Sequence, residues 1–308
     1  MEADPALPAL DEVLALAKKS ARLAGETIKK AWSQKGEVKD TKSNSVDLVT
    51  ETDQQCEEII MSLLKGSYPD HKIIGEETAG ASKYELTDAP TWTIDPIDGT
   101  TNFVHRLALS CVIIAFLHRR EVLVGVIYDP FADELFSARK GCGSFLERSG
   151  LEPVRLSVSS TDCLAQAVIS MDPGYGRDCD AVNKFCSLQR VILERGTRNI
   201  RVLGSTGLNM AYVACGRLDA GFEQGSWCTN LGPKIWDFAA GKLLVEEAGG
   251  ITVDITNTVP CTTPLDVMQR SFFCAATKEL SAELQEAIAE GRELSLELSS
   301  ARTKRPRL

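Results

Sequence analysis

The chain has 308 residues, of which 44% are hydrophobic and 25% are charged, and its net charge is −9. These values are typical of a globular protein with one extended domain or two halves, and the negative charge argues against nucleic acid or an anionic membrane as the main partner. The ten cysteines form no C-x-x-C pair, no apolar run reaches transmembrane length, and residues 1–10 resemble neither a secretory signal nor a transit peptide. We therefore expect a cytoplasmic protein with reduced thiols and no membrane partner.

Apolar residues recur at helical spacing from Leu10 to Ile28 and predict a first amphipathic helix of roughly two dozen residues. The segments that follow are predicted, in chain order, as a polar loop or hairpin over 35–46, a helix over 53–65, a short buried strand at 73–74 and a polar loop over 79–90. Further on, β-branched runs predict an antiparallel hairpin at 111–117 and 122–128 and more strands at 134–138 and 143–147.

A polar break at 157–162 separates this half from the rest of the chain. The elements predicted after it are a strand at 168–171, helices at 180–194 and 205–215, a strand at 220–223, a helix at 236–248, a strand at 272–276 and a helix at 281–290. Helices and hairpins without strict β-α-β alternation favour an α+β protein of stacked layers. We divide the chain into an N-terminal half (1–156), a C-terminal half (157–293) and a basic tail (294–308).

The basic tail is expected to be disordered. A frayed, solvated terminus is the simpler interpretation of its arginines and lysines, and a nuclear-import or partner-binding signal is the alternative.

The most informative segment is residues 92–103, WTIDPIDGTTNF, which places Asp95 and Asp98 three residues apart at the end of an apolar, β-prone run. Protein Mg²⁺ sites use one or two carboxylates together with substrate phosphate oxygens. Gly99 allows the backbone to approach a ligand, so N–H groups near Thr100 can face an anion. The carboxylate pair alone would be better explained by an Asp-Pro turn with an Asx cap. The whole segment favours a cation site beside a phosphate.

This segment resembles the signature of the inositol monophosphatase family, which are Mg²⁺-dependent phosphomonoesterases inhibited by lithium. Further matches occur in the family's order at 42–53 (KSNSVDLVTETD), 73–77 (IIGEE), 236–241 (WDFAAG) and 247–250 (EAGG). The resemblance extends from about residue 11 to about residue 276. It implies a layered α-β-α-β-α sandwich of the inositol monophosphatase and fructose bisphosphatase type, with metals held in the N-terminal half, and it implies a homodimer.

The resemblance also implies a set of metal ligands for two or three Mg²⁺ ions: the carboxylates of Glu76, Asp95, Asp98 and Asp237, and the backbone carbonyl of Ile97. Cations are needed to offset repulsion among so many carboxylates beside a phosphate. The alternatives are that Glu76 belongs to a solvated acidic pair and that Asp237 simply favours the dipole of the helix that it begins.

Hydrolysis by a metal-activated water is the reaction that the resemblance implies, with Asp53, Thr100 and Glu76 as catalytic residues. Asp53 could instead only cap the second helix. The residues that the match assigns to substrate binding are Lys42, Gly99, Thr100, Ser205, Glu223 and Asp237. A loop lysine such as Lys42 is otherwise a solvated surface residue.

Two segments depart from the family pattern. Residues 224–235 form a longer spacer than usual between Glu223 and the WDFAAG motif, and residues 171–178 align poorly. The longer spacer is either a plain surface loop or a wall that selects the leaving alcohol.

We therefore expect a phosphatase that converts myo-inositol monophosphate to myo-inositol and phosphate, in inositol metabolism and phosphatidylinositol signalling. One alternative is a phosphatase of the same family for histidinol phosphate, a sugar phosphate or a nucleotide 3′-phosphate. A second alternative is a non-catalytic, metal-dependent scaffold.

Overall fold

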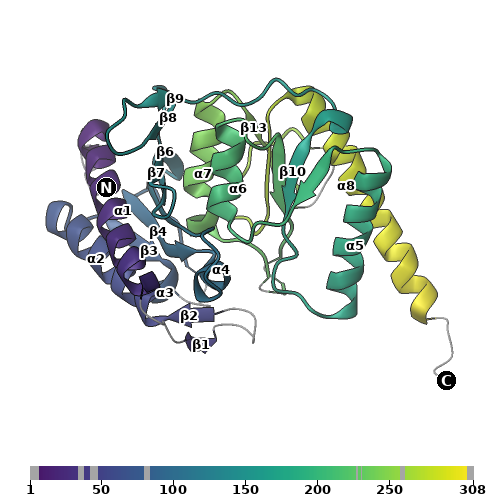
Figure 1. Ribbon diagram of the computed structural model, residues 1–308, viewed down its shortest axis with the longest axis horizontal. Coiled ribbons are helices and arrows are strands. Elements are labelled where there is room, and N and C mark those ends of the chain that lie inside the picture. The colour runs from purple at the N-terminus through teal and green to yellow at the C-terminus, as the bar shows by residue number, and fades with distance from the viewer. Residues whose placement is uncertain are drawn as a thin grey trace.

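The computed structural model describes residues 7–33, 38–41, 48–79, 84–226, 228–229, 231–256 and 261–303. Five layers are stacked side by side in the fold (Figure 1). In order they are helices α1 (Leu10–Ser33) and α2 (Glu51–Ser67), a seven-stranded sheet, helices α6 (Thr206–Ala214) and α7 (Ile235–Glu247), a five-stranded sheet, and helices α5 (Cys179–Glu194) and α8 (Lys278–Thr303). The predicted α-β-α-β-α sandwich is confirmed.

The seven-stranded sheet has the order β3-β4-β5-β6-β7-β8-β9. Its strands are β3 (Lys72–Gly75), β4 (Thr91–Asp98), β5 (Cys111–His118), β6 (Glu121–Asp129), β7 (Glu134–Arg139), β8 (Ser144–Glu147) and β9 (Val154–Arg155). β3 pairs with β4 in parallel and the other neighbours are antiparallel, so the predicted hairpin is confirmed as β5 and β6.

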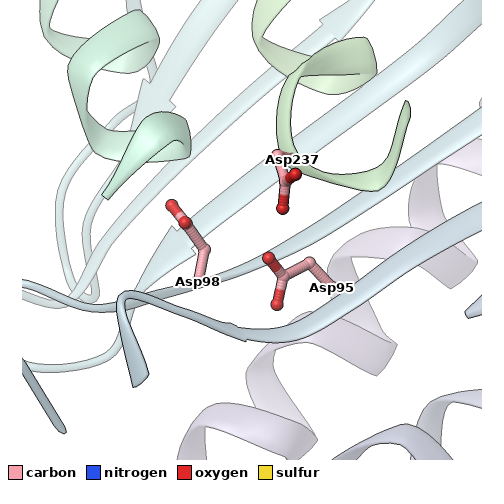
Figure 2. Close-up of side chains that lie close together, drawn as sticks. All are labelled: Asp95, Asp98 and Asp237. Atoms are coloured by element: carbon pink, nitrogen blue, oxygen red, sulfur yellow. The ribbon is translucent and has the colours of Figure 1, made fainter. Parts of the chain in front are cut away.

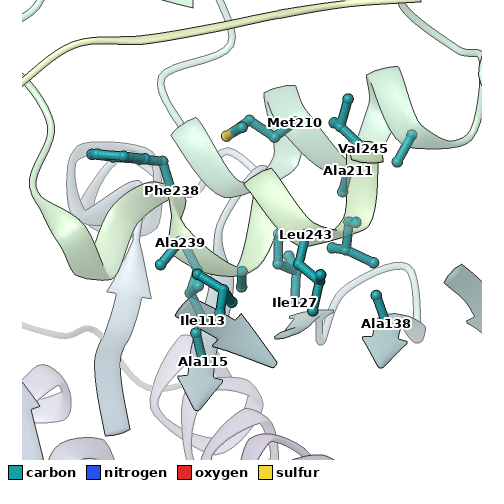
Figure 3. Close-up of a cluster of buried hydrophobic side chains, with 14 of the residues drawn as sticks. Ile113, Ala115, Ile127, Ala138, Met210, Ala211, Phe238, Ala239, Leu243 and Val245 are labelled. Atoms are coloured by element: carbon teal, nitrogen blue, oxygen red, sulfur yellow. The ribbon is translucent and has the colours of Figure 1, made fainter. Parts of the chain in front are cut away.

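Strand β5 is buried on both faces, which explains its unbroken apolar sequence. Ile113 and Ala115 pack beneath α6 and α7 (Figure 3), while Ile114 and Phe116 on the opposite face pack in the core that includes α1 and α2. Because successive side chains of a strand alternate between faces, this single strand contributes to two cores.

The five-stranded sheet has the order β11-β10-β12-β14-β13. Its strands are β10 (Val168–Met171), β11 (Asn199–Arg201), β12 (Ala220–Glu223), β13 (Ile251–Thr252) and β14 (Phe272–Ala275). β10 runs parallel to β11 and β12, whereas β14 is antiparallel to β12 and β13. The sequence did not predict β9, β11 and β13, because two or three residues are too few to show a periodic pattern.

The remaining described elements are short. They are an antiparallel pair, β1 (Val38–Thr41) and β2 (Leu48–Thr50), the helices α3 (Glu76–Ala79) and α4 (Thr100–Val104), and a 3₁₀ turn at Leu164–Gln166.

The prediction of a disordered tail from residue 294 is wrong as far as residue 303, because α8 continues to Thr303. Ser295 is buried, and the Ser299 hydroxyl donates to Asp180 of α5 at 3.0 Å. The C-terminal part of the helix is therefore supported by a contact with its neighbour α5. Residues 304–308 lie outside the described part of the chain.

Helix α7 contacts strands of both sheets, including β6 and β13. The division into halves at residue 156 therefore stays a prediction, although the first sheet ends at Arg155 and the second begins at Val168. Within the described ranges, no helix combines the length and the apolar character needed to cross a bilayer.

Candidate active site

Three carboxylates converge where β4 ends against the start of α7. Asp95 and Asp98 come from β4 and Asp237 from the first turn of α7, and each offers an oxygen within 4.8 Å of the others (Figure 2). In a regular strand, residues three apart point to opposite faces. The register of β4 against β5 shifts between Asp95 and Asp98, and this irregularity brings both side chains to the same side.

Asp98 is fixed by the beginning of α6, across the boundary between the two halves of the chain. Its Oδ2 accepts the Ser205 hydroxyl at 2.5 Å and the Gly207 N–H at 2.7 Å. Ser205 also accepts the Leu208 N–H, so it is the N-cap of α6 as predicted. The substrate contact assigned to Ser205 stays a prediction, but the structure gives its hydroxyl a role in holding Asp98.

The position of Asp237 is compatible with both interpretations considered from the sequence, a helix cap and a metal ligand. Its carboxylate accepts the backbone N–H of Lys234 and so caps α7, while the other side of the carboxylate group faces Asp95 and Asp98 (Figure 2). A capping role and a ligand role are compatible, since a carboxylate has about four acceptor positions.

Burial and mutual repulsion raise the pKa values of the Asp98 and Asp237 carboxyls. Desolvation is the largest cause for both, and it raises the pKa of Asp98 to about 6 and that of Asp237 to about 7. The charge of Glu76 raises both pKa values further. These carboxylate oxygens are crowded, and the fold disfavours their negative charge. Such a set of oxygen donors suits a hard divalent cation, so the residues fit the metal dependence of the family described below.

Glu76 enters the site from the neighbouring strand. β3 and β4 are parallel with Gly75 beside Ile94, so the chain leaves β3 at the level of Asp95 and continues into α3. Glu76 lines the same cleft as Asp98 and Asp237, although it is not one of the three carboxylates within 4.8 Å. Its assignment as a ligand therefore stays a prediction, as does that of the Ile97 carbonyl, which accepts the Thr100 hydroxyl at 3.0 Å.

Thr100 and Asp53 are brought together as the sequence match implied. The Thr100 hydroxyl lies 3.3 Å from Oδ1 of Asp53, and Oδ2 of Asp53 accepts the backbone N–H of Thr50 at 2.8 Å. Asp53 is fully buried and stands in the first turn of α2. It therefore both caps α2 and orients Thr100, so neither interpretation excludes the other.

A cleft of about 270 Å³ opens beside these residues. Gly99, at the base of the cleft, has a φ of +86°, and a side chain there would meet the carbonyl oxygen of Leu109 at 2.8 Å, so only glycine fits. The predicted substrate residues Gly99, Thr100, Ser205, Glu223 and Asp237 all line the cleft, whereas Lys42 lies outside the described residues. The size is that of a site for a small molecule rather than a polymer.

Among the residues of this cleft that sequence reasoning missed are Asp172 and Arg270. Asp172 follows β10 and accepts the Gly204 N–H at 2.9 Å and the side-chain amide of Asn209. The sequence signal that could have identified Asp172 is its position directly after a buried strand. Arg270 is 1% exposed and favours the charged form of Glu223, whose pKa is raised by burial and then by Asp172 and Asp237.

The two segments that depart from the family pattern meet in space. A Cβ added to Gly176 would lie 3.3 Å from the Leu231 side chain, which shows how closely the segments approach. The Arg270 guanidinium donates to the carbonyl of Gly232 at 2.6 Å and to that of Pro233 at 2.9 Å. Residues 232–234 are therefore held at the cleft, whereas Cys228 and Thr229 of the same loop are exposed.

The raised pKa values predict how pH affects the metal-free protein. Below about pH 7, folded Asp237 retains a proton that the unfolded chain releases near its ordinary pKa of 3.8. The free energy of unfolding should therefore fall as pH rises from about 4 to 7. With chelator present, we expect the Tm to be at least about 2 °C lower at pH 8 than at pH 5.5, the shift that 1 kcal/mol gives in a chain of this size.

Thermal unfolding at the two pH values checks this prediction. The Asp237→Asn variant, which cannot ionise, should show a smaller pH effect, and an equal effect in parent and variant would contradict the assignment.

Comparison with known proteins agrees with this geometry. The model of the inositol monophosphatase family matches residues 9–293. Inositol monophosphatase 2 of Rattus norvegicus is 37% identical over 279 residues, which is 90% of this chain and 90% of that protein. Inositol monophosphatase 2 of Solanum lycopersicum is 42% identical over 248 residues, 80% of this chain and 88% of that protein.

Among solved structures, an IMPase from Thermotoga maritima matches with a TM-score of 0.72 at 30% identity, covering 94% of this chain and 98% of that chain. The protein therefore belongs to the inositol monophosphatase family and is a phosphatase that hydrolyses phosphate monoesters.

Proposed function

We propose that this phosphatase depends on Mg²⁺ and acts on myo-inositol monophosphate, releasing myo-inositol and phosphate. The observation that carries the proposal is the convergence of Asp95, Asp98 and Asp237 within 4.8 Å at one end of a small cleft. The names of the relatives, inositol monophosphatases of an animal and a plant, support the choice of substrate.

The three aspartates would hold the cation, with Glu76 at the edge of the same cleft. A bound Mg²⁺ supplies neutralisation of phosphate charge and acidification of a nearby water. Carboxylate oxygens favour Mg²⁺ over metals that prefer sulfur or nitrogen ligands. Two or three ions fit the proposal, since Glu76 and the Ile97 carbonyl extend the set of oxygen ligands.

The chain's own contribution to water activation is the Thr100–Asp53 pair. The Thr100 hydroxyl has one proton and two acceptors within reach, the Ile97 carbonyl at 3.0 Å and Asp53 at 3.3 Å. When the proton points to Asp53, the Thr100 oxygen is left to accept a hydrogen bond from a water molecule. Asp53 is buried and held by Thr50, so the pair orients that water without a histidine. A proton taken from the water can pass to Thr100 as Thr100 passes its own to Asp53.

The wall on the proposed leaving-group side carries two carboxyls, and cationic side chains of Arg177, Lys234 and Arg270 line the cleft with them. This polar, mixed lining supports a polyol as the alcohol. Glu223 and Asp172 line the cleft, and carboxylates accept hydrogen bonds from hydroxyl groups. The charge of Asp172 raises the pKa of Glu223, so the two carboxyls lie within electrostatic reach of one another.

The carboxyls of Glu223 and Asp172 favour a second candidate, histidinol phosphate, whose alcohol carries an ammonium group. An ammonium ion beside two carboxylates gains Coulomb energy that a neutral polyol does not. A panel of substrates therefore has to separate these two alcohols.

The panel measures phosphate release from myo-inositol 1-phosphate, histidinol phosphate, a sugar phosphate and a nucleotide 3′-phosphate. We expect the highest kcat/KM with the inositol phosphate. A higher kcat/KM with histidinol phosphate would make histidinol phosphate the proposed substrate and leave the reaction class unchanged. No phosphate release from any substrate would favour the non-catalytic scaffold.

The loop at 224–235 should influence this ranking. Gly225 and Gly232 pack so closely that a Cβ on Gly232 would lie 2.4 Å from the Gly225 Cα, so deletion of residues 226–231 leaves a short gap to rejoin. We expect the deletion to change the ratio of kcat/KM values between inositol phosphate and the other esters by about tenfold, or about 1.4 kcal/mol of transition-state binding.

The Asp237 carboxylate accepts the backbone N–H of Lys234, which lies outside the deleted residues. Mg²⁺ affinity should therefore be retained, and it serves as the control. An unchanged ranking in a folded variant that binds Mg²⁺ would exclude a role of this loop in specificity.

Membership of the family also supports two further parts of the proposal. These are inhibition by lithium and assembly as a homodimer. The same membership supports a role in inositol metabolism and phosphatidylinositol signalling.

A further inference from the structure

A second buried carboxylate on α2, Glu57, lies one helical turn beyond Asp53. It is 2% exposed, and each of its oxygens accepts a backbone hydrogen bond. The Glu77 N–H donates to Oε2 at 2.8 Å, and the Thr78 N–H donates to Oε1 at 2.9 Å. Both N–H groups belong to the first turn of α3, the turn that begins with Glu76.

The first N–H groups of any helix lack partners within the helix. In α3, which spans Glu76–Ala79, most residues have such an N–H group. The orientation of α3 therefore depends on acceptors that lie outside the helix. Glu57 is that acceptor for two consecutive residues, and it holds them from a long helix that is packed in the core.

Gly75 makes room for this arrangement. A Cβ at Gly75 would lie 2.6 Å from the Glu57 carboxyl group, closer than side chains pack, so a larger residue directly before Glu76 would displace this carboxylate. The backbone on both sides of Glu76 is thus shaped to fit the Glu57 carboxylate.

We propose that Glu57 is a positioning residue for the metal site: by holding the first turn of α3, it directs the Glu76 carboxylate toward Asp98 and Asp237. The proposal rests on the proposed function, since it assumes that these carboxylates bind Mg²⁺. One helix, α2, then supports two parts of the site, with Asp53 orienting Thr100 and Glu57 orienting Glu76.

Replacement of Glu57 by glutamine tests the proposal. Glutamine has the same shape, but one of its two acceptor oxygens becomes an NH₂ group that faces a backbone N–H. The measurement is the Kd for Mg²⁺ by titration calorimetry on metal-stripped, folded protein. We expect Glu57→Gln to weaken Mg²⁺ binding by about 10- to 100-fold, the range found when a residue that supports a metal ligand is replaced.

Asp129 offers a matched control outside the site. It is also 2% exposed, and its Oδ1 accepts the backbone N–H groups of Phe131 at 2.8 Å and Ala132 at 3.0 Å. Asp129→Asn also removes the charge of a buried carboxyl, although its remaining oxygen can still accept both N–H groups, and it should leave the Kd for Mg²⁺ at the parent value. Equal weakening by the two substitutions would show a general loss of stability and would overturn the proposal.

Parent affinity for Mg²⁺ in folded Glu57→Gln would also overturn it. If Glu57→Gln does not fold, Glu57→Asp keeps both acceptor oxygens on a shorter side chain and should still bind Mg²⁺ more weakly than the parent. Parent affinity in Glu57→Asp would then overturn the proposal. Absence of Mg²⁺ binding by the parent protein would instead refute the proposed function, and this inference with it.

Discussion

Asp98→Asn should lower kcat by about 10³-fold or more and weaken Mg²⁺ binding, although the shape of the side chain is kept. Asp98 is 8% exposed, lies within 4.8 Å of Asp95 and Asp237, and accepts the Ser205 hydroxyl and the Gly207 N–H. Asparagine removes a charge and places an NH₂ group where an acceptor is needed. Loss of one partner from a buried charged contact costs about 4 kcal/mol, which corresponds to about 10³-fold in rate.

The control for this variant is Asp219→Asn. Asp219 is 9% exposed and accepts a hydroxyl, that of Ser159, at 2.6 Å and a backbone N–H, that of Val168, at 2.7 Å. It precedes β12, at the end of the strand opposite Glu223, and should affect stability without affecting the requirement for Mg²⁺. Steady-state kinetics over a range of Mg²⁺ concentrations decide the matter, and full turnover of Asp98→Asn at parent Mg²⁺ concentrations would refute the ligand assignment.

Thr100→Ala should lower kcat by about 10²-fold or more and leave the Kd for Mg²⁺ close to the parent value. Loss of a group that takes part in proton transfer has an effect of this size. Thr100 is a better choice for this test than Asp53, because Asp53 also accepts the Thr50 N–H and its replacement would disturb the start of α2. Single-turnover kinetics and Mg²⁺ titration measure the two effects separately.

Thr100→Ser, which keeps the hydroxyl, is the matched control and should retain most of the activity. If Thr100→Ala turns over at the parent rate, the water-activating role of Thr100 is wrong. If it instead loses Mg²⁺ affinity, Thr100 acts through the Ile97 carbonyl, which accepts its hydroxyl at 3.0 Å.

Much of the fold follows from patterns that are local in the sequence. The apolar stripe from Leu10 predicted α1, and the paired β-branched runs predicted β5 and β6. Burial of one helix face leaves a periodic pattern, and burial of both strand faces leaves an unbroken apolar run. The motif at 92–103 predicted the position of the candidate site, because Asp95, Asp98 and Gly99 are close together in the chain.

Other parts of the site depend on contacts between distant residues and left little trace. Glu57 contacts the turn after Glu76 across 20 positions, and Arg270 contacts Gly232 across 38 positions. In the sequence, each is a single charged residue among many. The extended end of α8 was missed for the same reason, since its partner Asp180 lies 119 residues away from Ser299.

The double positions of Asp53 and Asp237, each a helix cap that also lies in the candidate site, were not predicted either. Sequence reasoning treated a helix cap and an active-site residue as alternatives for these two aspartates. The starts of α6 and α7 line the cleft, and Asp53 at the start of α2 contacts Thr100, which lines it too. Helix N-termini favour negative charge, so caps and cation-binding carboxylates occur at the same places.

The most direct test of the account is phosphate release from myo-inositol 1-phosphate by metal-stripped protein to which Mg²⁺ is then restored. The carboxylates of the cleft are the proposed cation site, so we predict no measurable release in excess chelator and full recovery with Mg²⁺. Release that continues at the same rate in excess chelator would contradict the account.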